Sequence, residues 1–478
     1  MTSDSTAFVS KYAKELANDN AAAFVGAGLS KAAGYVDWPG LLDPIAKELG
    51  LDVRKENDLV ALAQYYVNTK GSNRHQLSQL LIENFSDLQE PTENHKILAR
   101  LPIRAFWTTN YDTLIESALQ AGGKITDVKY TTEQLTTTKA RRDVVVYKMH
   151  GDVNHPGSAV LTKDEYERYH RTHEPFITAL SGALVSTTFC FLGFSFNDPN
   201  LDYILSRVRT TFTRNQRAHY CITKRRRRNE FSSKAHFDYA TIKQQLVTQD
   251  LLRFNIETVF VEEYSQITDL LREVEKRHRV RTVFISGSAH EYGSWDLATA
   301  HGFITLLASQ LIHRKFKITT GFGLGVGGPL VTGAVQAIYS RKLGSVEDQL
   351  VMRPFPVEIA DPAQRQKTFE RYREDIVAQS GIAIFLFGNK LDAGNVVNAS
   401  SIEREFELAA KMGLWLVPVG ASGFIAEELW RRVMSSYNQY YRGTPKGLFR
   451  LLDSLGKTAD PVELVNIIIE IVEQLSTE

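Results

Sequence analysis

Cysteine is almost absent from this sequence, with only Cys190 and Cys221 in 478 residues. Two cysteines provide neither a disulfide framework nor the four thiolates of a zinc ribbon. A reduced environment suits such a chain. We therefore expect a cytoplasmic protein without a metal site.

The sequence also lacks a large excess of positive or negative charge, and it lacks long hydrophobic runs. The formal net charge is +1, so no overall field draws the protein toward nucleic acid or a membrane surface. No stretch approaches the ~18 uninterrupted apolar residues of a membrane span, and the start, MTSDSTAFVSKYAKELANDN, has no signal-peptide core. The basic run Lys224–Arg228 lies between two expected strands and predicts a solvated loop. We expect no nucleic-acid or membrane partner.

The length of 478 residues predicts two or three domains. Strand-like apolar runs alternate with helical patterns, which is typical of a parallel, doubly wound sheet. The early runs are Ala22–Val25, Ala105–Thr108, Val144–Met149, Thr188–Gly193, His219–Ile222 and Thr258–Val261. The pattern restarts near Arg281 with TVFISGSAHEYG, FKITTGFG, GIAIFLFGNK and LWLVPVGASG. We predict an α/β fold of two Rossmann-like doubly wound domains, residues 1–278 and 279–478, the first with a helical insertion at about 39–100.

A glycine-rich turn follows the first apolar run, in the stretch AAFVGAGLSKAAGY. Gly26 and Gly28 permit a close backbone approach, and Ser30 opens an expected helix, an arrangement that favours phosphate. The dinucleotide fingerprint requires a third glycine where Lys31 stands. A tight turn without a ligand is the alternative.

Three further motifs stand at the ends of expected strands, where open α/β sheets bind ligands. FWTTNYD delivers Thr109, Asn110 and Asp112, and the alternative is that Asn110 and Asp112 only cap the following helix. In VVVYKMHGD, His150 is suited to proton transfer near neutral pH, or is a hydrogen-bonded structural histidine. The fourth motif, GFSFND, has glycine and serine suited to phosphate or ribose.

The set GAGLS, TTNYD, KMHGD and GFSFND resembles, in order and spacing, the sirtuin-like family over about residues 7–265. The resemblance implies NAD binding, with Asn110 near the nicotinamide ribose and His150 as the catalytic base. Asp37 matches a family position in GYVDWP, the counterpart of GIPDFR in deacylating sirtuins. The substrate-binding residues that it implies are Gly26, Ala27, Gly28, Ser30, Asp37, Thr109, Asp112, Gly193, Ser195 and Asp198.

Two departures separate this chain from the protein-deacylating sirtuins. It has no pair of CxxC motifs, so no zinc ribbon is expected, and the arginine of GIPDFR is replaced. Acyl-lysine binding is therefore disfavoured, and hydrolysis of NAD to ADP-ribose and nicotinamide remains, with NAD as substrate and no cofactor. The alternatives are a protein deacylase, a non-catalytic NAD- or nucleotide-binding regulator, and a DNA-processing role, against which the near-neutral charge argues.

The second half carries two glycine-rich turns after strands, FISGSA and TTGFGLGVGGP. It resembles the SLOG family of nucleotide sensors, without the PGGxGT loop of the hydrolase branch. Arginine and lysine suit phosphate, and glutamate suits a ribose or base; surface ion pairs are the alternative. The candidate ligand-binding residues are Gly287, Ser288, Gly323, Leu324, Gly325, Arg371, Arg373, Lys390 and Glu405.

A sirtuin-like domain followed by a SLOG domain resembles the effectors of bacterial Thoeris anti-phage defence over essentially the whole chain. ENHKILARLPI, LGFSFNDPNLDYILSRVR and TGFGLGVG carry this resemblance. It implies a homotetrameric NAD hydrolase, silent until a cyclic ADP-ribose isomer from a partner TIR-domain protein binds the C-terminal domain. Arg373, Lys390 and Glu405 match positions of the signal pocket in that family.

Overall fold

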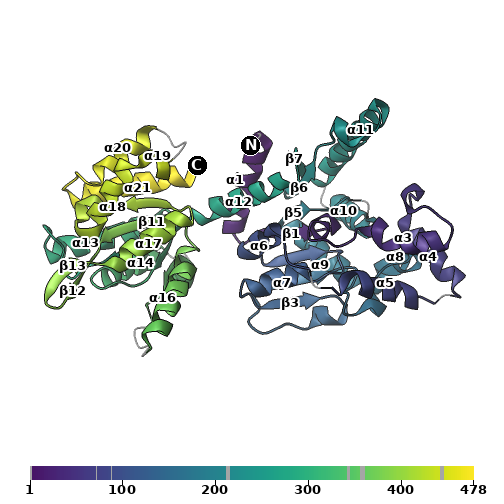
Figure 1. The fold of residues 1–478 in the computed structure, drawn as a ribbon, viewed down its shortest axis with the longest axis horizontal. Helices are drawn as coiled ribbons and strands as arrows, with labels where there is room; N and C mark the ends of the chain where they lie inside the picture. Colours follow the sequence, from purple (N-terminus) through teal and green to yellow (C-terminus); the bar gives the residue numbers. More distant parts are fainter. Residues whose placement is uncertain are drawn as a thin grey trace. The chain divides into compact units, whose positions relative to one another are not determined.

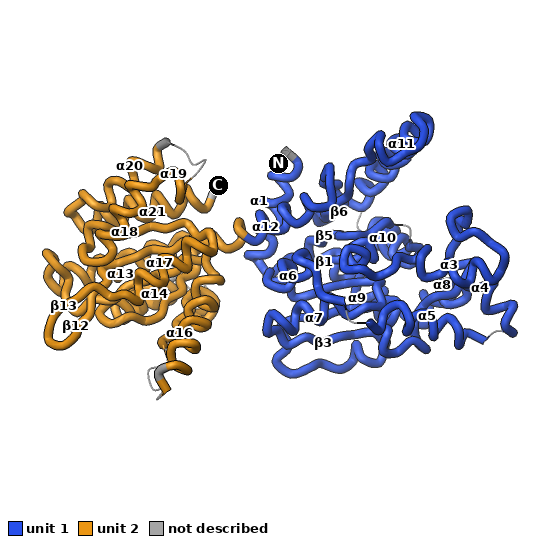
Figure 2. Tube along the Cα trace, in the orientation of Figure 1, with its two compact units in different colours: residues 1–275 blue, residues 276–478 orange. Residues whose placement is uncertain are grey.

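The computed structural model describes residues 3–71, 73–87, 89–196, 198–211, 216–341, 345–355, 361–441 and 446–477. The chain divides into unit 1, Met1–Glu275, and unit 2, Lys276–Glu478 (Figure 2). The division falls inside helix α12, Ser265–Arg279, which also contains the predicted boundary at residue 278. Each unit has its own parallel sheet, which confirms the predicted α/β class with two Rossmann-like domains.

Unit 1 is built on a seven-stranded parallel sheet of order β3-β4-β2-β1-β5-β6-β7 (Figure 1). Its strands are β1 Ala21–Val25, β2 Ala105–Thr108, β3 Thr126–Lys129, β4 Val144–Lys148, β5 Thr188–Leu192, β6 His219–Lys224 and β7 Ile256–Val261. Its helices are α1 Ser3–Ala17, α2 Ala27–Lys31, α3 Trp38–Glu48, α4 Leu59–Thr69, α5 His75–Phe85, α6 Glu93–Arg100, α7 Leu114–Ala121, α8 Lys163–Thr172, α9 Glu174–Ser186, α10 Pro199–Thr211 and α11 Lys234–Leu251, followed by α12. Short 3-10 helices are η1 Val53–Lys55, η2 Glu133–Thr136, η3 Pro156–Ser158, η4 Arg228–Glu230 and η5 Leu252–Phe254.

Both faces of this sheet are buried, because side chains alternate along each strand. Ala21, Ala23 and Val25 of β1 belong to one apolar cluster, with residues of α1, α6, α7 and α12. Ala22 and Phe24 belong to the opposite cluster, with residues of α8, α9 and α10. Two buried faces explain why the strands are continuous apolar runs.

The predicted helical insertion contains α3 to α6, which fall into two groups. Helices α3, α4 and α5 form a separate apolar cluster that includes Tyr111 and Val153 from the site loops. Helix α6 instead packs Ile97 and Leu98 into the sheet layer with α1 and α7. The insertion therefore reaches the carboxyl edge of the sheet through α3–α5.

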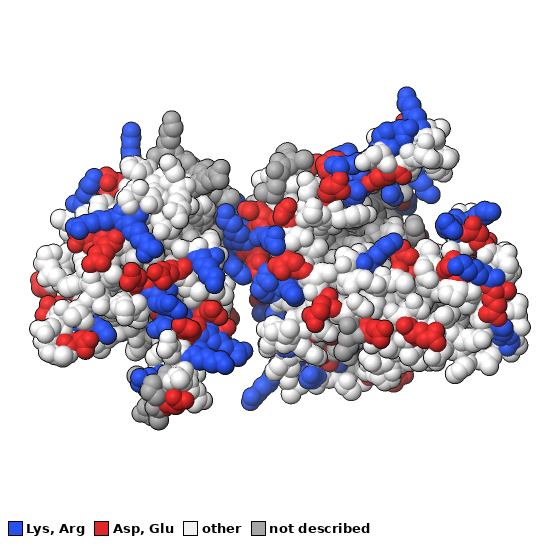
Figure 3. Space-filling view, viewed as in Figure 1, with Lys and Arg blue, Asp and Glu red and all other residues white. Residues whose placement is uncertain are grey.

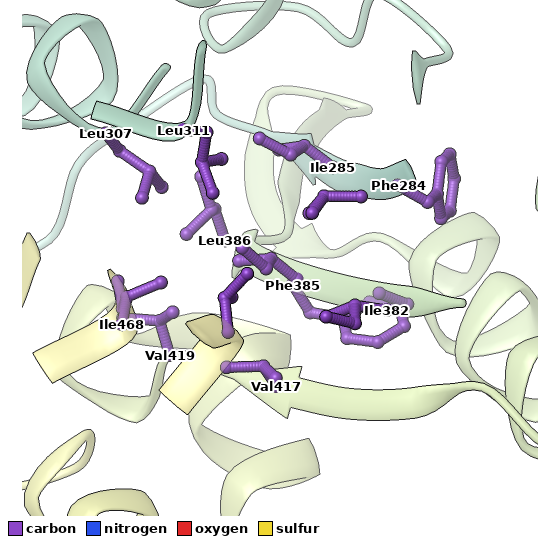
Figure 4. Packing of buried hydrophobic residues seen from close by; sticks show 14 of the residues in the cluster. Phe284, Ile285, Leu307, Leu311, Ile382, Phe385, Leu386, Val417, Val419 and Ile468 are labelled. Carbon is purple, nitrogen blue, oxygen red and sulfur yellow. The ribbon is translucent and has the colours of Figure 1, made fainter. Parts of the chain in front are cut away.

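Unit 2 has a five-stranded parallel sheet of order β10-β9-β8-β11-β14 and a two-stranded hairpin, β12–β13. Its strands are β8 Thr282–Ser288, β9 Lys317–Thr320, β10 Leu350–Met352, β11 Ile382–Phe387, β12 Asn389–Asp392, β13 Asn395–Asn398 and β14 Trp415–Pro418. Its helices are α13 Leu297–His313, α14 Gly327–Arg341, α15 Val346–Gln349, α16 Pro362–Val377, α17 Ser400–Lys411, α18 Phe424–Ser435, α19 Tyr437–Tyr440, α20 Lys446–Ser454 and α21 Pro461–Thr477, with a 3-10 helix η6 Gly420–Ser422. Side chains of α13, α21, β8, β11 and β14 converge in one apolar cluster (Figure 4).

Positive and negative side chains are interspersed on the visible face of each unit (Figure 3). The basic run follows this pattern, because Lys224, Arg225 and Arg227 pair with nearby carboxylates. Lys224 Nζ lies 2.7 Å from Glu230 and 3.1 Å from Glu263, and Arg225 Nε lies 3.2 Å from Glu262. No helix of the described residues is long and apolar enough to cross a bilayer.

Candidate active site

The four motif loops of unit 1 follow four neighbouring strands. In the sheet these strands stand in the order β4-β2-β1-β5, and all pairings between them are parallel. The loops KMHGD, TTNYD, GAGLS and GFSFND therefore leave the same edge of the sheet. From β1 the chain adds β2, β3 and β4 on one side of β1, and it then adds β5, β6 and β7 on the other side. This reversal is the switch point at which open α/β sheets bind ligands.

The glycine turn after β1 packs directly on the backbone of Gly193 after β5. Gly26 N donates to Leu192 O at 2.8 Å, and Gly28 N donates to Gly193 O at 2.9 Å. A Cβ at Gly26 would lie 2.5 Å from Gly193 O, and one at Gly28 2.9 Å from Gly193 Cα. These glycines are needed for backbone contact between two loops, and the amides of Gly26 and Gly28 are already engaged.

A chain of hydrogen bonds joins the glycine turn to the loop after β2. Asn110 Nδ2 donates to Ser30 Oγ at 2.8 Å, and Ser30 Oγ donates to Asp112 Oδ2 at 2.6 Å. The other carboxylate oxygen, Asp112 Oδ1, accepts from Leu114 N, the first amide of α7, at 3.1 Å, although the N-cap position of this helix is Thr113. Ser30 and Asp112 are buried, whereas Asn110 is half-buried. Ser30, Asn110 and Asp112 therefore converge. The alternative of helix capping is met only in that Asp112 accepts from the first amide of α7, because the Asn110 side chain bonds to Ser30 and the N-cap is Thr113.

His150 lies just after β4 among polar side chains, with 2% of its surface exposed. Its Nε2 lies 3.5 Å from Asp198 Oδ2 and 3.4 Å from Asn200 Nδ2. On the other side Nδ1 lies 3.3 Å from the Tyr166 hydroxyl, and the Tyr169 ring meets the imidazole edge-on. Since Asp198 follows β5, this contact joins loops from the two outer strands of the group of four.

The His150 imidazole is kept neutral by its surroundings. Burial lowers its pKa below the usual 6.5, and the nearby Asp198 carboxylate opposes this only in part. A neutral imidazole is the form that accepts a proton. At neutral pH, His150 is therefore in the form that can act as a base.

Burial in unit 1 also predicts acid sensitivity. It lowers the pKa of His95, His173 and His219 to about 4, and it also lowers the pKa of His150 below its usual value. The unfolded chain binds these protons more readily, so this stability is present above pH 6.5 and is lost as pH falls toward 4. We expect the free energy of unfolding to fall between pH 6.5 and 5, by up to about 1.4 kcal/mol per histidine per pH unit. Urea titrations at several pH values measure it.

The half-buried His173 provides a comparison within that experiment. His173→Gln removes one of the four groups, so the pH slope should become shallower. A free energy of unfolding that stays constant from pH 6.5 to 5 contradicts the prediction.

Several predicted site residues lie apart from these contacts. Asp37 accepts from Gly40 N at 3.0 Å as the cap of α3, and its Oδ2 lies 2.5 Å from Lys31 Nζ. Ala27 begins α2 with an exposed side chain, and Thr109 is half-buried. Ser195 is exposed and lines a cavity of about 150 Å³ with residues of α10 and α11. Asn197 of the GFSFND motif lies outside the described residues.

Three residues around His150 were not predicted from sequence. Tyr166 and Tyr169 lie on α8, and Asn200 lies in the first turn of α10. No motif marks them, because helix residues reach His150 only through the way α8 and α10 pack on the sheet. Asn200 directly follows the GFSFND motif and Pro199, which is the one available signal.

In unit 2, the two glycine-rich turns contact each other beside the switch point between β8 and β11. A Cβ at Gly323 would lie 1.9 Å from Gly287 O, and one at Gly325 2.1 Å from Ala289 O. Ala289 N donates to Leu324 O at 2.7 Å, while the Leu324 side chain is exposed. Both turns therefore face the same edge of the sheet.

A partly buried charge cluster lies at the same edge. Ser286 Oγ donates to Glu405 Oε2 at 2.6 Å, and Arg373 Nε lies 3.8 Å from Glu405 Oε1. The Arg373 guanidinium stands over the rings of Phe355 and Phe369, 5.2 and 5.9 Å from their centroids. Burial raises the pKa of Glu405, although Ser286 and Arg373 oppose this shift.

The other predicted residues of unit 2 are more open. Lys390, on hairpin strand β12, is exposed and lies 4.0 Å from Asp392. Arg371 on α16 is exposed as well. The Ser288 hydroxyl donates to Asn389 O at 3.1 Å, and the buried Asn389 side chain accepts from His290 N and Glu291 N at 2.8 and 3.0 Å. Asn389 therefore organises the loop after β8, a role that its position in FGNK does not indicate.

Comparison with known proteins agrees with both halves of this description. Residues 104–242 match a SIR2-like domain, and residues 266–475 match the Sir2- and TIR-associating SLOG family. NAD(+) hydrolase ThsA of Bacillus cereus (strain MSX-D12) is 49% identical over 470 residues, covering 98% of each chain. NAD(+) hydrolase ThsA of Acinetobacter baumannii (strain 532279) is 47% identical over 472 residues, covering 97% of this chain and 98% of that protein.

The chain belongs to the NAD(+) hydrolase ThsA family. Membership confirms the two predicted resemblances, sirtuin-like and then SLOG, in their order along the chain. A shorter match, to Defense-associated sirtuin 2 of Bacillus subtilis, is 31% identical over 196 residues, 39% of this chain and 19% of that protein.

The site of this ThsA-family chain lies mostly inside the SIR2-like match. Three of the four motif loops fall within residues 104–242, and the glycine turn at Gly26–Ser30 precedes it. No group of three or more His, Cys, Asp or Glu side chains placed to hold a metal ion occurs in the described parts of the chain.

Proposed function

We propose that this ThsA-family chain hydrolyses NAD+ at the edge formed by the four motif loops, with Asn110 and His150 as the central residues. The C1′–N bond to nicotinamide breaks, and its electron pair leaves with the nicotinamide nitrogen. Water adds to C1′, and its proton passes to His150 and then to solvent. The products are ADP-ribose and nicotinamide.

The observation that carries this proposal is the neutral, buried His150 at the strand edge shared with the Asn110–Ser30 pair. The reacting sugar passes through an oxocarbenium-like state, so a proton acceptor for the attacking water is required. Asn110 holds the nicotinamide ribose or positions the water. Binding of the rest of NAD+ along GAGLS and GFSFND supplies remote binding energy that orients the sugar.

We further propose that a cyclic ADP-ribose isomer, made by a partner TIR-domain protein, binds unit 2 and activates hydrolysis. The family that matches this region is described as Sir2- and TIR-associating. A relative that matches part of this chain is named Defense-associated sirtuin 2. Arg373 Nε has no hydrogen-bond partner among the described residues, which leaves a donor for a phosphate. The ligand must bind the active arrangement more tightly than the resting one. In this proposal the active protein is a homotetramer. It depletes cytoplasmic NAD+ and so aborts phage infection.

The test is NAD+ turnover by the purified full chain, with and without cyclic ADP-ribose and each of its linkage isomers. We expect nicotinamide release only with one of these ligands. Release without any of them refutes activation. No release under every condition refutes the hydrolase site and favours a binding regulator, while deacylation of an acetyl-lysine peptide identifies a deacylase.

Removing the Arg373 guanidinium should weaken activation selectively. A charged hydrogen bond contributes about 1.5–3 kcal/mol, so Arg373→Ala should raise the half-activating ligand concentration about 10- to 150-fold. The maximal rate at saturating ligand should stay unchanged. Arg404→Ala on α17, which removes an exposed partner of Glu370, is the matched control. Equal ligand sensitivity of the Arg373→Ala variant and the native chain contradicts the sensor site.

A further inference from the structure

Lys148 is a fully buried cation in the sheet of unit 1. It is the last residue of β4, its side chain is 0% exposed, and it precedes His150 by two positions. Burial lowers the pKa of Lys148, but the carboxylates of Glu116 and Asp152 outweigh this and raise it overall. The ammonium therefore remains charged at neutral pH.

The Lys148 ammonium contacts both loops that carry the central site residues. Its Nζ donates to the backbone carbonyls of Tyr111 at 3.1 Å and Asp112 at 2.5 Å. It also lies 2.5 Å from Asp152 Oδ2 and 3.0 Å from Glu116 Oε1. Four oxygen atoms from three segments thus surround one nitrogen atom.

These contacts flank Asn110 and His150 closely. Tyr111 and Asp112 directly follow Asn110, and Lys148 and Asp152 stand two residues before and two residues after His150. The turn that carries His150 is consequently closed by the Lys148–Asp152 pair. The loop that carries Asn110 is held to that turn through the same nitrogen atom.

We infer that Lys148 is a positioning residue for NAD+ cleavage, because its ammonium joins the Asn110 loop to the His150 turn. The inference rests on the roles proposed for Asn110 and His150. Fold stability alone does not require this lysine, since well-packed apolar residues often replace buried ion clusters without loss of stability. A displacement of reacting groups by about 1 Å, in contrast, lowers rates about 100-fold.

The decisive variant removes the lysine and both of its charged partners together. Lys148→Met/Glu116→Gln/Asp152→Asn removes the ammonium together with the two carboxylates that form ion pairs with it. We expect this full-length variant to fold, with kcat for NAD+ at least about 100-fold lower and KM within about threefold of the native value. A folded variant whose kcat is within threefold of the native value overturns the inference.

Lys129 offers a matched control on the neighbouring strand. It is the last residue of β3, is buried, lies 2.8 Å from Asp127 and donates to Thr137 O at 2.6 Å. Lys129→Met/Asp127→Asn should leave kcat and KM unchanged. An equal loss of kcat in this control shows a general packing effect and also overturns the inference.

If the triple variant does not fold, the isosteric Asp152→Asn tests the same connection. It weakens the Lys148 contact on the His150 side, so kcat should fall about 10-fold at constant KM. An unchanged kcat contradicts the positioning role. Asn110→Ala and His150→Ala are measured in parallel. If both variants retain native turnover, the proposed roles of Asn110 and His150 fail. If both lose turnover while the Lys148 variants keep it, only the positioning role of Lys148 is rejected.

Discussion

Loss of NAD+ cleavage is expected when His150 is replaced. In a His150→Ala variant kcat should fall by about 10²- to 10⁴-fold, the range for removal of a general base. Asn110→Ala should lower kcat at least about 100-fold, because the sugar or the attacking water loses its orientation. Nicotinamide release by the full chain, assayed under the conditions that give the highest native turnover, measures both.

The exposed His170 on α8 provides the control for this prediction. His170→Ala should hydrolyse NAD+ at the native rate. Thermal unfolding checks that the His150→Ala variant is folded, since His150 is buried. Native turnover in folded His150→Ala and Asn110→Ala proteins would remove both residues from the mechanism.

A single methyl group at Gly193 should also weaken both the fold and the binding of NAD+. The backbone there has φ +65°, and an added Cβ would lie 2.4 Å from Leu29 N and 3.1 Å from Gly26 O. Since backbone atoms cannot move aside cheaply, strain and overpacking together should cost about 2–5 kcal/mol of unfolding free energy in Gly193→Ala. The displaced glycine turn should raise KM for NAD+ at least about 10-fold. Urea unfolding and steady-state kinetics test the two effects.

Gly182→Ala is the matched control for Gly193→Ala. Gly182 lies within helix α9, and a Cβ there meets nothing within 4 Å. This substitution should leave KM unchanged and stabilise the helix by about 0.5–1 kcal/mol. A Gly193→Ala variant with native stability and native KM would show that the two loops do not need close backbone contact.

The central strands could be predicted from sequence because each is buried on both faces. The runs at β1, β2, β4 and β5 are continuously apolar, and glycine or polar motifs mark where they end. The edge strand β3, TDVK, was missed because its charged side chains interrupt the apolar pattern. Strand β10 and hairpin β12–β13 were missed because these strands are short and carry exposed side chains.

The chemistry-bearing residue types were also determined locally. Asn110, Asp112 and His150 each stand within four residues of the end of an apolar run, so their place near a strand end follows from the sequence. Ser30 is likewise placed by its glycine turn. Ser30 is separated from Asn110 and Asp112 by 80 or more residues along the chain. No local sequence pattern predicts the hydrogen bonds that Ser30 forms with them.

By itself, then, the sequence determined which side chains stand at strand ends, because burial and turn formation are local properties. Only the tertiary structure decided that the loops lie in the order β4-β2-β1-β5, since strand order depends on how crossover helices pack on the two faces. That order places β4 beside β2, so the Lys148 ammonium reaches the backbone behind Asn110. The loops after β4 and β5 bring His150 and Asp198 together across the two strands between them. The strand order also changes the meaning of the incomplete glycine fingerprint, because Gly26 and Gly28 are required for contact with Gly193.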